Sequence, residues 1–319
     1  MGIFGRKRRP RSRQARPDPD LSMLSVDEAA RLRSLVAGWF AQRGTEVSIA
    51  PGYVQTDQGN KYGLWNLAAR CHDDGRGPAA WPGLVDEHLT VLLEAEQTDI
   101  EGFTDEEFRD LLRLRLLEDQ PDPDDDPGHA PLWAPGVRRH LVLDLPTTVI
   151  TPSRAELDRR GALGPLTDLA WQQTASIVVT EDLERERVEA DGHYAWCVLG
   201  DSVFTASLAL FLPDVVRRFE PGVGLDRGVI FSIPLRHQLN YRVVEHPMSV
   251  LDALLVLPQF TVAGFRDAIG PVSPSVYLWL YGEVTRLSTV DDGQITVRPG
   301  PHLEPLLRQV DDLDGPTAR

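Results

Sequence analysis

Short apolar runs separated by polar turns dominate the middle of the chain. The apolar run at residues 194–199 ends at Gly200 and is typical of a buried strand. A mostly apolar helix is predicted at 203–211. A shorter amphipathic helix follows Pro213, because proline is tolerated in the first turn of a helix. Two further apolar strands are predicted at 228–233 and 239–244. This unit is apolar enough to lie at the centre of a domain.

Helical and strand periodicities recur on both sides of that unit. Ser25 and Glu28 have the spacing of a capping box, so the first helix begins at Ser25, and Gly44 ends it. Further helices are predicted at 81–95, 104–118, 166–179, 247–269 and 302–310. Further strands are predicted at 46–50, 53–56, 140–145, 183–190, 276–281, 284–287 and 294–298. Asp191-Gly192 and Asp292-Gly293 are hairpin turn signals. The pattern predicts an α+β protein with mixed or antiparallel sheets and helices packed on them.

A stretch rich in proline and aspartate interrupts this pattern at 119–128. It predicts a linker at 119–135 between an N-terminal α+β lobe at 21–118 and a C-terminal α+β domain at 136–312. Its acidic spacing lacks the central glycine and the final glutamate of a calcium-binding loop, so no metal site is predicted there. A disordered basic tail is expected at 1–20 and a frayed tail at 313–319.

Charge narrows the possible partners. The formal net charge is −15, from 33 Lys and Arg against 48 Asp and Glu. The folded body is therefore not expected to bind nucleic acid, since affinity for phosphates requires clustered cations. Only the Arg-rich residues 6–16 predict a contact with nucleic acid, anionic lipid or an acidic partner. The alternative is that this tail only aids solubility.

Cysteine and hydropathy patterns bear on the compartment. Two isolated cysteines do not form a disulfide framework, which favours a reducing cytoplasm. Cys197 lies in an apolar strand and is predicted to be buried, whereas Cys71 lies in a polar segment and is expected to react first with thiol reagents. No membrane span is predicted, because the apolar run at 250–257 is too short and contains Asp252.

One region resembles a known family. Leu141-Val142-Leu143-Asp144, the helix at 166–179, Gly200-Asp201-Ser202 and Ile233-Pro234-Leu235-Arg236-His237 occur in an order that is similar to the YtpQ-like family of uncharacterised bacterial proteins. The similar part covers about residues 138–245. The family often has Pro-x-Arg-Asp where this chain has Pro234-Leu235-Arg236-His237. The resemblance implies an α+β cytoplasmic protein and no particular activity.

Gly200-Asp201-Ser202 is the first candidate for chemistry. Between a strand and a helix it looks like the nucleophile block of GDS-type esterases, with Ser202 as nucleophile, Asp201 beside it and His237 as a candidate base. A serine nucleophile requires a base within reach. Those esterases use an aspartate three residues before a late histidine, and His193, His237, His246 and His302 have Ala190, Pro234, Val243 and Pro299 at that position. The alternative is a helix N-cap, for which Asp201 is favoured over Ser202 because its charge complements the helix N-terminus.

Ligand-binding candidates are few. Arg236 and His237 lie at a strand end or turn, where binding residues often occur, although an exposed turn is the simpler interpretation. Tyr277, Trp279 and Tyr281 alternate along one strand and predict either core packing or a ligand- or peptide-binding face. Cys71-His72-Asp73-Asp74 has no second cluster to complete a metal site and is expected to be a solvated loop.

No phosphate loop or dinucleotide fingerprint is present in the sequence, so no cofactor is predicted. Taken together, these patterns favour a non-catalytic binding or protein-interaction module, for which a protein is the expected partner. The alternative is a serine hydrolase centred on Asp201 and Ser202.

Overall fold

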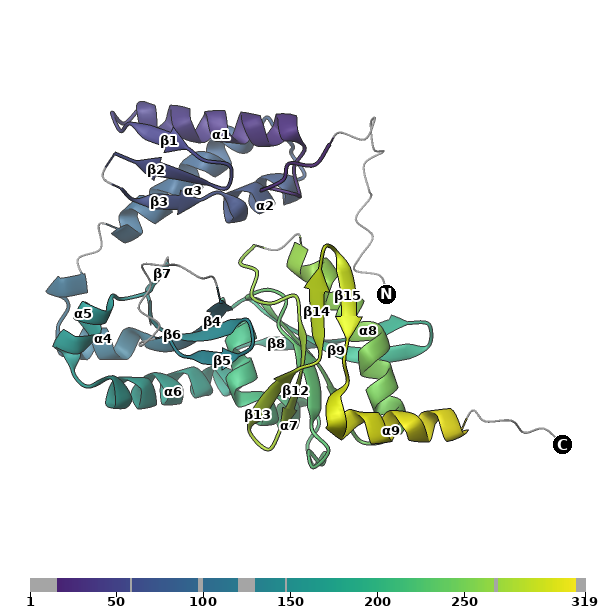
Figure 1. Ribbon diagram of the computed structural model, residues 1–319. Coiled ribbons are helices and arrows are strands. Elements are labelled where there is room, and N and C mark those ends of the chain that lie inside the picture. The colour runs from purple at the N-terminus through teal and green to yellow at the C-terminus, as the bar shows by residue number, and fades with distance from the viewer. Residues whose placement is uncertain are drawn as a thin grey trace. The chain divides into compact units, whose positions relative to one another are not determined.

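A computed structural model (Figure 1) describes residues 16–57, 59–96, 100–119, 130–146, 148–266 and 269–313. Helices and antiparallel sheets make up these residues, which confirms the predicted α+β fold. The chain forms two compact units, Met1–Thr90 and Val91–Arg319. Their boundary falls inside helix α3 (Trp81–Glu96), earlier than the predicted linker at 119–135.

Two paired strands account for this difference. Strand β4 (Leu112–Glu118) pairs antiparallel with β6 (Val137–Asp144), from Leu112 opposite Leu143 to Glu118 opposite Val137. The segments on both sides of the predicted linker therefore belong to one sheet. A composition signal is local and carries no information about which strands pair across it. Residues 120–129 of that linker, and 314–319 of the predicted C-terminal tail, lie outside the described residues.

Unit 1 contains a small antiparallel sheet and helices. The sheet has the order β1 (Val47–Ile49), β2 (Tyr53–Thr56), β3 (Lys61–Gly63), and α1 (Val26–Ala41) and α2 (Trp65–Asp73) flank it in the chain. The predicted capping box is present: Ser25 Oγ accepts from the Glu28 N–H at 3.3 Å, and Glu28 Oε2 accepts from the Ser25 N–H at 2.9 Å.

The expected tail at 1–20 needs a correction. Residues 1–15 lie outside the described part of the chain. Asp18, however, is buried, and its carboxylate accepts hydrogen bonds from Arg33 Nη1 at 2.9 Å and from Arg33 Nη2 at 3.0 Å. Leu21 and Leu24 are also buried. The sequence did not predict this contact between Asp18 and Arg33, because a single buried carboxylate produces no periodic pattern in a basic segment.

The first layer of unit 2 is a four-stranded sheet with helices. Its order is β4-β6-β5, with β7 also paired to β6. Its other elements are η1 (Ile100–Gly102), α4 (Asp105–Leu111), β5 (Leu132–Ala134), β7 (Val149–Ile150), α5 (Arg154–Arg160) and α6 (Leu163–Thr180). The helix predicted at 104–118 was wrong after residue 111. Leu112, Leu114 and Leu116 are buried at every second position, which is the period of a strand.

The centre of unit 2 is a six-stranded antiparallel sheet (Figure 1) with the order β13-β12-β10-β11-β9-β8. Its strands are β8 (Leu183–Ala190), β9 (His193–Gly200), β10 (Val229–Ser232), β11 (Gln238–Val243), β12 (Val276–Leu280) and β13 (Glu283–Arg286). The 3₁₀ helix η2 (Thr205–Phe211) and helix α7 (Leu212–Phe219) contribute to the hydrophobic core on one face of this sheet. Helices α8 (Pro247–Arg266) and α9 (Gly300–Leu313) contribute to the core on the other face. The apolar stretch at 194–241 thus lies at the centre, as predicted.

Two helix hydroxyl groups accept hydrogen bonds from the backbone of β4. Thr174 Oγ1 of α6 accepts from the Leu114 N–H at 2.8 Å, and Ser207 Oγ of η2 accepts from the Leu116 N–H at 3.0 Å. These backbone N–H groups lie on an edge of β4 that has no partner strand among the described residues. Side-chain acceptors therefore satisfy buried donors that a further strand would otherwise take.

Helix α8 is long and apolar enough to cross a membrane by length and composition, and it alone meets both criteria within the described ranges. Half of its apolar stretch is buried, on the sheet. Its first turns carry the buried Asp252, which binds Arg242 Nη2 at 3.2 Å and His193 Nδ1 at 2.9 Å. Packing against the sheet accounts for the apolar character of this helix.

The hairpin β14–β15 completes the chain before α9. Strands β14 (Ser288–Asp291) and β15 (Gln294–Val297) pair antiparallel around Asp292 and Gly293, whose φ angles are 49° and 78°. The hairpin β8–β9 turns in the same way at Asp191 and Gly192, with φ of 52° and 84°. Both predicted turns are confirmed, because Asp-Gly pairs adopt these positive angles readily.

Candidate functional site

The loop between β9 and η2 holds the residues of the predicted nucleophile block. Ser202 Oγ accepts from the Phe204 N–H at 3.2 Å, and the Ser202 carbonyl accepts from the Thr205 N–H at 3.2 Å and from Thr205 Oγ1 at 2.8 Å. Asp201 is exposed. The predicted N-cap is therefore wrong: η2 is a 3₁₀ helix that begins at Thr205 after Phe204, without a side-chain cap, and Ser202 closes the turn that precedes it.

His237 lies against this loop but contacts its backbone. The Gly200 N–H donates to the His237 carbonyl at 3.2 Å, and Arg236 Nε donates to His237 Nε2 at 2.9 Å. Burial and then the Arg236 charge lower the pKa of His237, while hydrogen bonds to the backbone of Gly200 and Ser202 partly oppose this. Among the described residues, no hydrogen bond joins the Ser202 hydroxyl to an imidazole.

A cavity of about 310 Å³ opens beside His237. Its lining residues are Asp182, Glu184, Leu199, Gly200, Asp201 and His237. Three carboxylates make it acidic, yet no group of three or more His, Cys, Asp or Glu side chains in the described ranges is arranged to hold a metal ion. The cavity is thus lined by carboxylates and by the His237 imidazole, whose Nε2 accepts a hydrogen bond from Arg236.

The charge of Arg236 acts on a second arginine, Arg115 of β4. Its N–H donates to the Gly270 carbonyl at 3.0 Å, and its carbonyl accepts from the Ala206 N–H at 3.0 Å. Arg115 of β4 has a buried Nε that finds no hydrogen-bond partner in the described structure. Burial, with the nearby Arg236 charge, lowers the pKa of Arg115 to about 10. The arginines are therefore held by fold contacts, and Arg115 is an unfavourable buried charge.

The aromatic candidates separate in the structure. Tyr277 is fully buried: its O–H donates to the Pro135 carbonyl at 3.0 Å, and its oxygen accepts from Ser273 Oγ at 2.7 Å. Trp279 packs half-buried against the same core. Tyr281 is 76% exposed in the β12–β13 turn, with a φ of 51°. Two of the three rings thus pack in the core, and only Tyr281 is available at the surface.

The Cys71-His72-Asp73-Asp74 segment is not the predicted solvated loop. Cys71, His72 and Asp73 form the last turn of α2, and Cys71 is 2% exposed. Its carbonyl accepts from Trp81 Nε1 at 3.1 Å. Leu67 and Cys71 lie four residues apart and share the buried face of the helix. The surrounding polar residues concealed this spacing.

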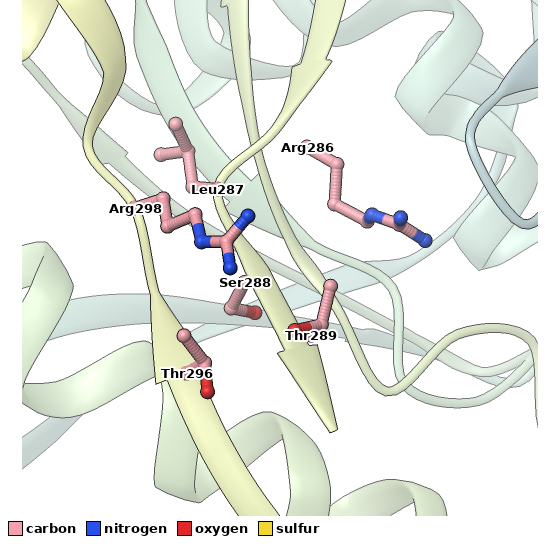
Figure 2. Close-up of a pocket in the computed structure, with 6 residues that line it drawn as sticks. All are labelled: Arg286, Leu287, Ser288, Thr289, Thr296 and Arg298. Atoms are coloured by element: carbon pink, nitrogen blue, oxygen red, sulfur yellow. The ribbon is translucent and has the colours of Figure 1, made fainter. Parts of the chain in front are cut away.

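A second, basic pocket lies at β13 and β14–β15 and was not anticipated from the sequence (Figure 2). Its cavity of about 140 Å³ is lined by Arg286, Leu287, Ser288, Thr289, Thr296 and Arg298. In Figure 2 the Arg298 guanidinium extends over β14 toward Ser288 and Thr289, while that of Arg286 points away from it. The Arg-x-Ser-Thr and Thr-x-Arg spacings were present in the sequence, but they are typical of any solvent-facing strand.

The two guanidinium groups of this basic pocket have no acidic partner within the described ranges. Neither the Arg286 nor the Arg298 guanidinium forms an ion pair or hydrogen bond with any residue that the structure describes. Thr289 and Thr296 are directly opposite each other on the hairpin. Ser288 is buried, and its Oγ accepts from the Val276 N–H at 2.8 Å, which anchors β14 to β12. Planar guanidinium and hydroxyl donors together suit a carboxylate or phosphoryl oxyanion.

No protein-family model, curated protein sequence or solved structure matches this chain. The resemblance to the YtpQ-like family stays a prediction.

Proposed function

We propose that the protein is a non-catalytic binding protein and that it holds an oxyanion of its partner in the Arg286–Arg298 pocket. The observation that carries this proposal is the Arg298 guanidinium, which has no ion-pair or hydrogen-bond partner among the described residues and shares its pocket with Arg286, Thr289 and Thr296, in a chain of formal net charge −15. With 48 acidic residues available, an arginine that only stabilised the fold would readily find a carboxylate. A bound oxyanion supplies the missing charge.

The geometry at Ser202 favours binding over hydrolysis. A serine nucleophile is activated by a base within hydrogen-bond reach. Here the Ser202 hydroxyl accepts from the Phe204 N–H, and His237 is occupied by Arg236 and by the loop backbone. These contacts support a structural role for the loop, and the alternative serine hydrolase has no comparable support.

Calorimetric titration with inorganic phosphate and with citrate tests the proposal and separates phosphoryl from carboxylate recognition. We expect a weak, roughly millimolar Kd for the preferred anion. Arg298→Gln should weaken binding about tenfold, because the guanidinium fork supplies the direct contacts. Added sodium chloride should weaken binding as well.

Arg308→Gln is the matched control, since Arg308 is an exposed arginine on α9 that does not line the pocket. It should bind the anion as the wild-type protein does. Absence of binding by both anions, or equal losses in Arg298→Gln and Arg308→Gln, would contradict the proposal.

A further inference from the structure

The outer edge of β15 carries unpaired backbone groups. The Arg298 N–H donates to the Leu287 carbonyl at 2.7 Å, and the hairpin register then alternates along β14 and β15. In such a ladder Thr289 and Thr296 form a hydrogen-bonded pair, whereas Ile295 and Val297 direct their N–H and C=O groups away from β14. Ile295 and Val297 bond to no other segment in the described structure.

This edge lacks the features that usually prevent strand addition. Sheet edges are protected by charged side chains, proline or bulges. Strand β8, an edge of the six-stranded sheet, follows this rule with Glu184, Arg185, Glu186 and Arg187 in succession. Strand β15 consists of Gln294, Ile295, Thr296 and Val297, without a charge or a proline. It is therefore a suitable template for an additional strand.

The free edge and the basic pocket lie on the same hairpin. Thr296 of β15 and Arg298, which follows it, line the pocket, while Ile295 and Val297 point their side chains to the opposite face and are half-buried. A strand added beside β15 would place every second side chain next to Thr296 and Arg298. Acidic side chains at those positions would neutralise the unpaired arginines.

We propose that an extended acidic segment of a partner protein adds to β15 as a third strand of the hairpin and places its Asp or Glu side chains in the Arg286–Arg298 pocket. The inference rests on the proposed oxyanion binding and identifies the partner as a polypeptide. Backbone hydrogen bonds to Ile295 and Val297 supply affinity, and the arginines select carboxylates. This is the division of roles in recognition by β-strand addition.

Two probes test the inference. One is a blocked peptide of alternating valine and glutamate, and the other is the same peptide with alternate backbone amides methylated, which keeps every carboxylate but removes donors. Val297→Pro removes an outward N–H and leaves the β14–β15 bonds intact. We expect the unmethylated peptide to bind, and we expect methylation, Val297→Pro and Arg298→Gln each to weaken it about tenfold.

Citrate binding separates this inference from the proposed function. Val297→Pro should leave the citrate Kd within about twofold of wild type, because the pocket itself is unchanged. If citrate binds through Arg298 but peptide affinity ignores methylation and Val297→Pro, strand addition is refuted and oxyanion binding stands. If neither probe depends on Arg298, both fail. A wild-type dimer that Val297→Pro dissociates, without peptide binding, identifies a second copy as the occupant and overturns the inference.

Discussion

The hydroxyl of Ser202 accepts a hydrogen bond from the backbone N–H of Phe204 at 3.2 Å. This contact belongs to the turn between β9 and η2 and gives a structural role to the side chain that an esterase would use as its nucleophile. It therefore links the local conformation of the loop to the choice between a binding protein and a hydrolase.

Substitution of this loop gives the first prediction. Ser202→Ala should lower the free energy of unfolding by about 0.5–1.5 kcal/mol, because it leaves the Phe204 N–H without its acceptor. Asp201→Ala should change it by less than about 0.5 kcal/mol, since Asp201 is exposed. Urea unfolding of the two variants measures both values. A fluorophosphonate probe should not label the wild-type protein, and a stoichiometric adduct on Ser202 would restore the hydrolase hypothesis.

Glycine 228 provides the second prediction. Its φ is +92°, and a Cβ at this position would lie 2.7 Å from the Trp279 carbonyl oxygen. Gly228→Ala should therefore destabilise unit 2 by at least about 1–3 kcal/mol. Gly38→Ala is the matched control, because Gly38 lies inside α1 with nothing within 4 Å of the added Cβ. It should stabilise its helix by roughly 0.5–1 kcal/mol. Equal effects in urea unfolding would contradict both assignments.

Thiol labelling tests the corrected position of Cys71. Burial raises the pKa of Cys71 and of Cys197 to about 12, and the two residues are 2% and 3% exposed. Because the thiolate is the reactive form, neither should react with iodoacetamide in the native protein at pH 8. Both should react once urea unfolds the chain. If Cys71 alone were modified rapidly in the native protein, this would contradict its burial in α2 and support the solvated loop that the sequence predicted.

His237 gives a prediction about acidic pH. Burial and the Arg236 charge lower its pKa in the folded state below the ordinary value of 6.5. The unfolded chain therefore binds the proton more tightly, so the stability contributed by neutral His237 is complete above pH 6.5 and declines as the pH falls below it. His237→Gln should flatten the loss of unfolding free energy between about pH 7.5 and 5.5. The exposed His302→Gln serves as control, and an unchanged slope in His237→Gln would contradict the burial of this imidazole.

Local signals along the chain were sufficient for part of this structure. The capping box of Ser25 and Glu28 and the hairpin turns at Asp191-Gly192 and Asp292-Gly293 were predicted and are present. Each depends on residues within four positions of one another, so the interaction that fixes the conformation is contained in a short stretch of sequence. The α+β class follows from the same local periodicities.

Tertiary structure decided what depends on distant partners. Strand β4 pairs with β6 across the predicted linker, and the buried face of Cys71 exists only because α2 packs in unit 1. The basic pocket needs Arg286 from one strand and Arg298 from beyond another, with the hairpin placing Thr289 opposite Thr296. Neighbouring residues were enough to predict the capping box and the hairpin turns, but not the strand at 112–118 or the helix end at Cys71, whose conformations depend on packing against distant segments. Which charges find partners among the described residues depends on the tertiary structure, because strand pairing sets the distances between side chains that are far apart in the sequence.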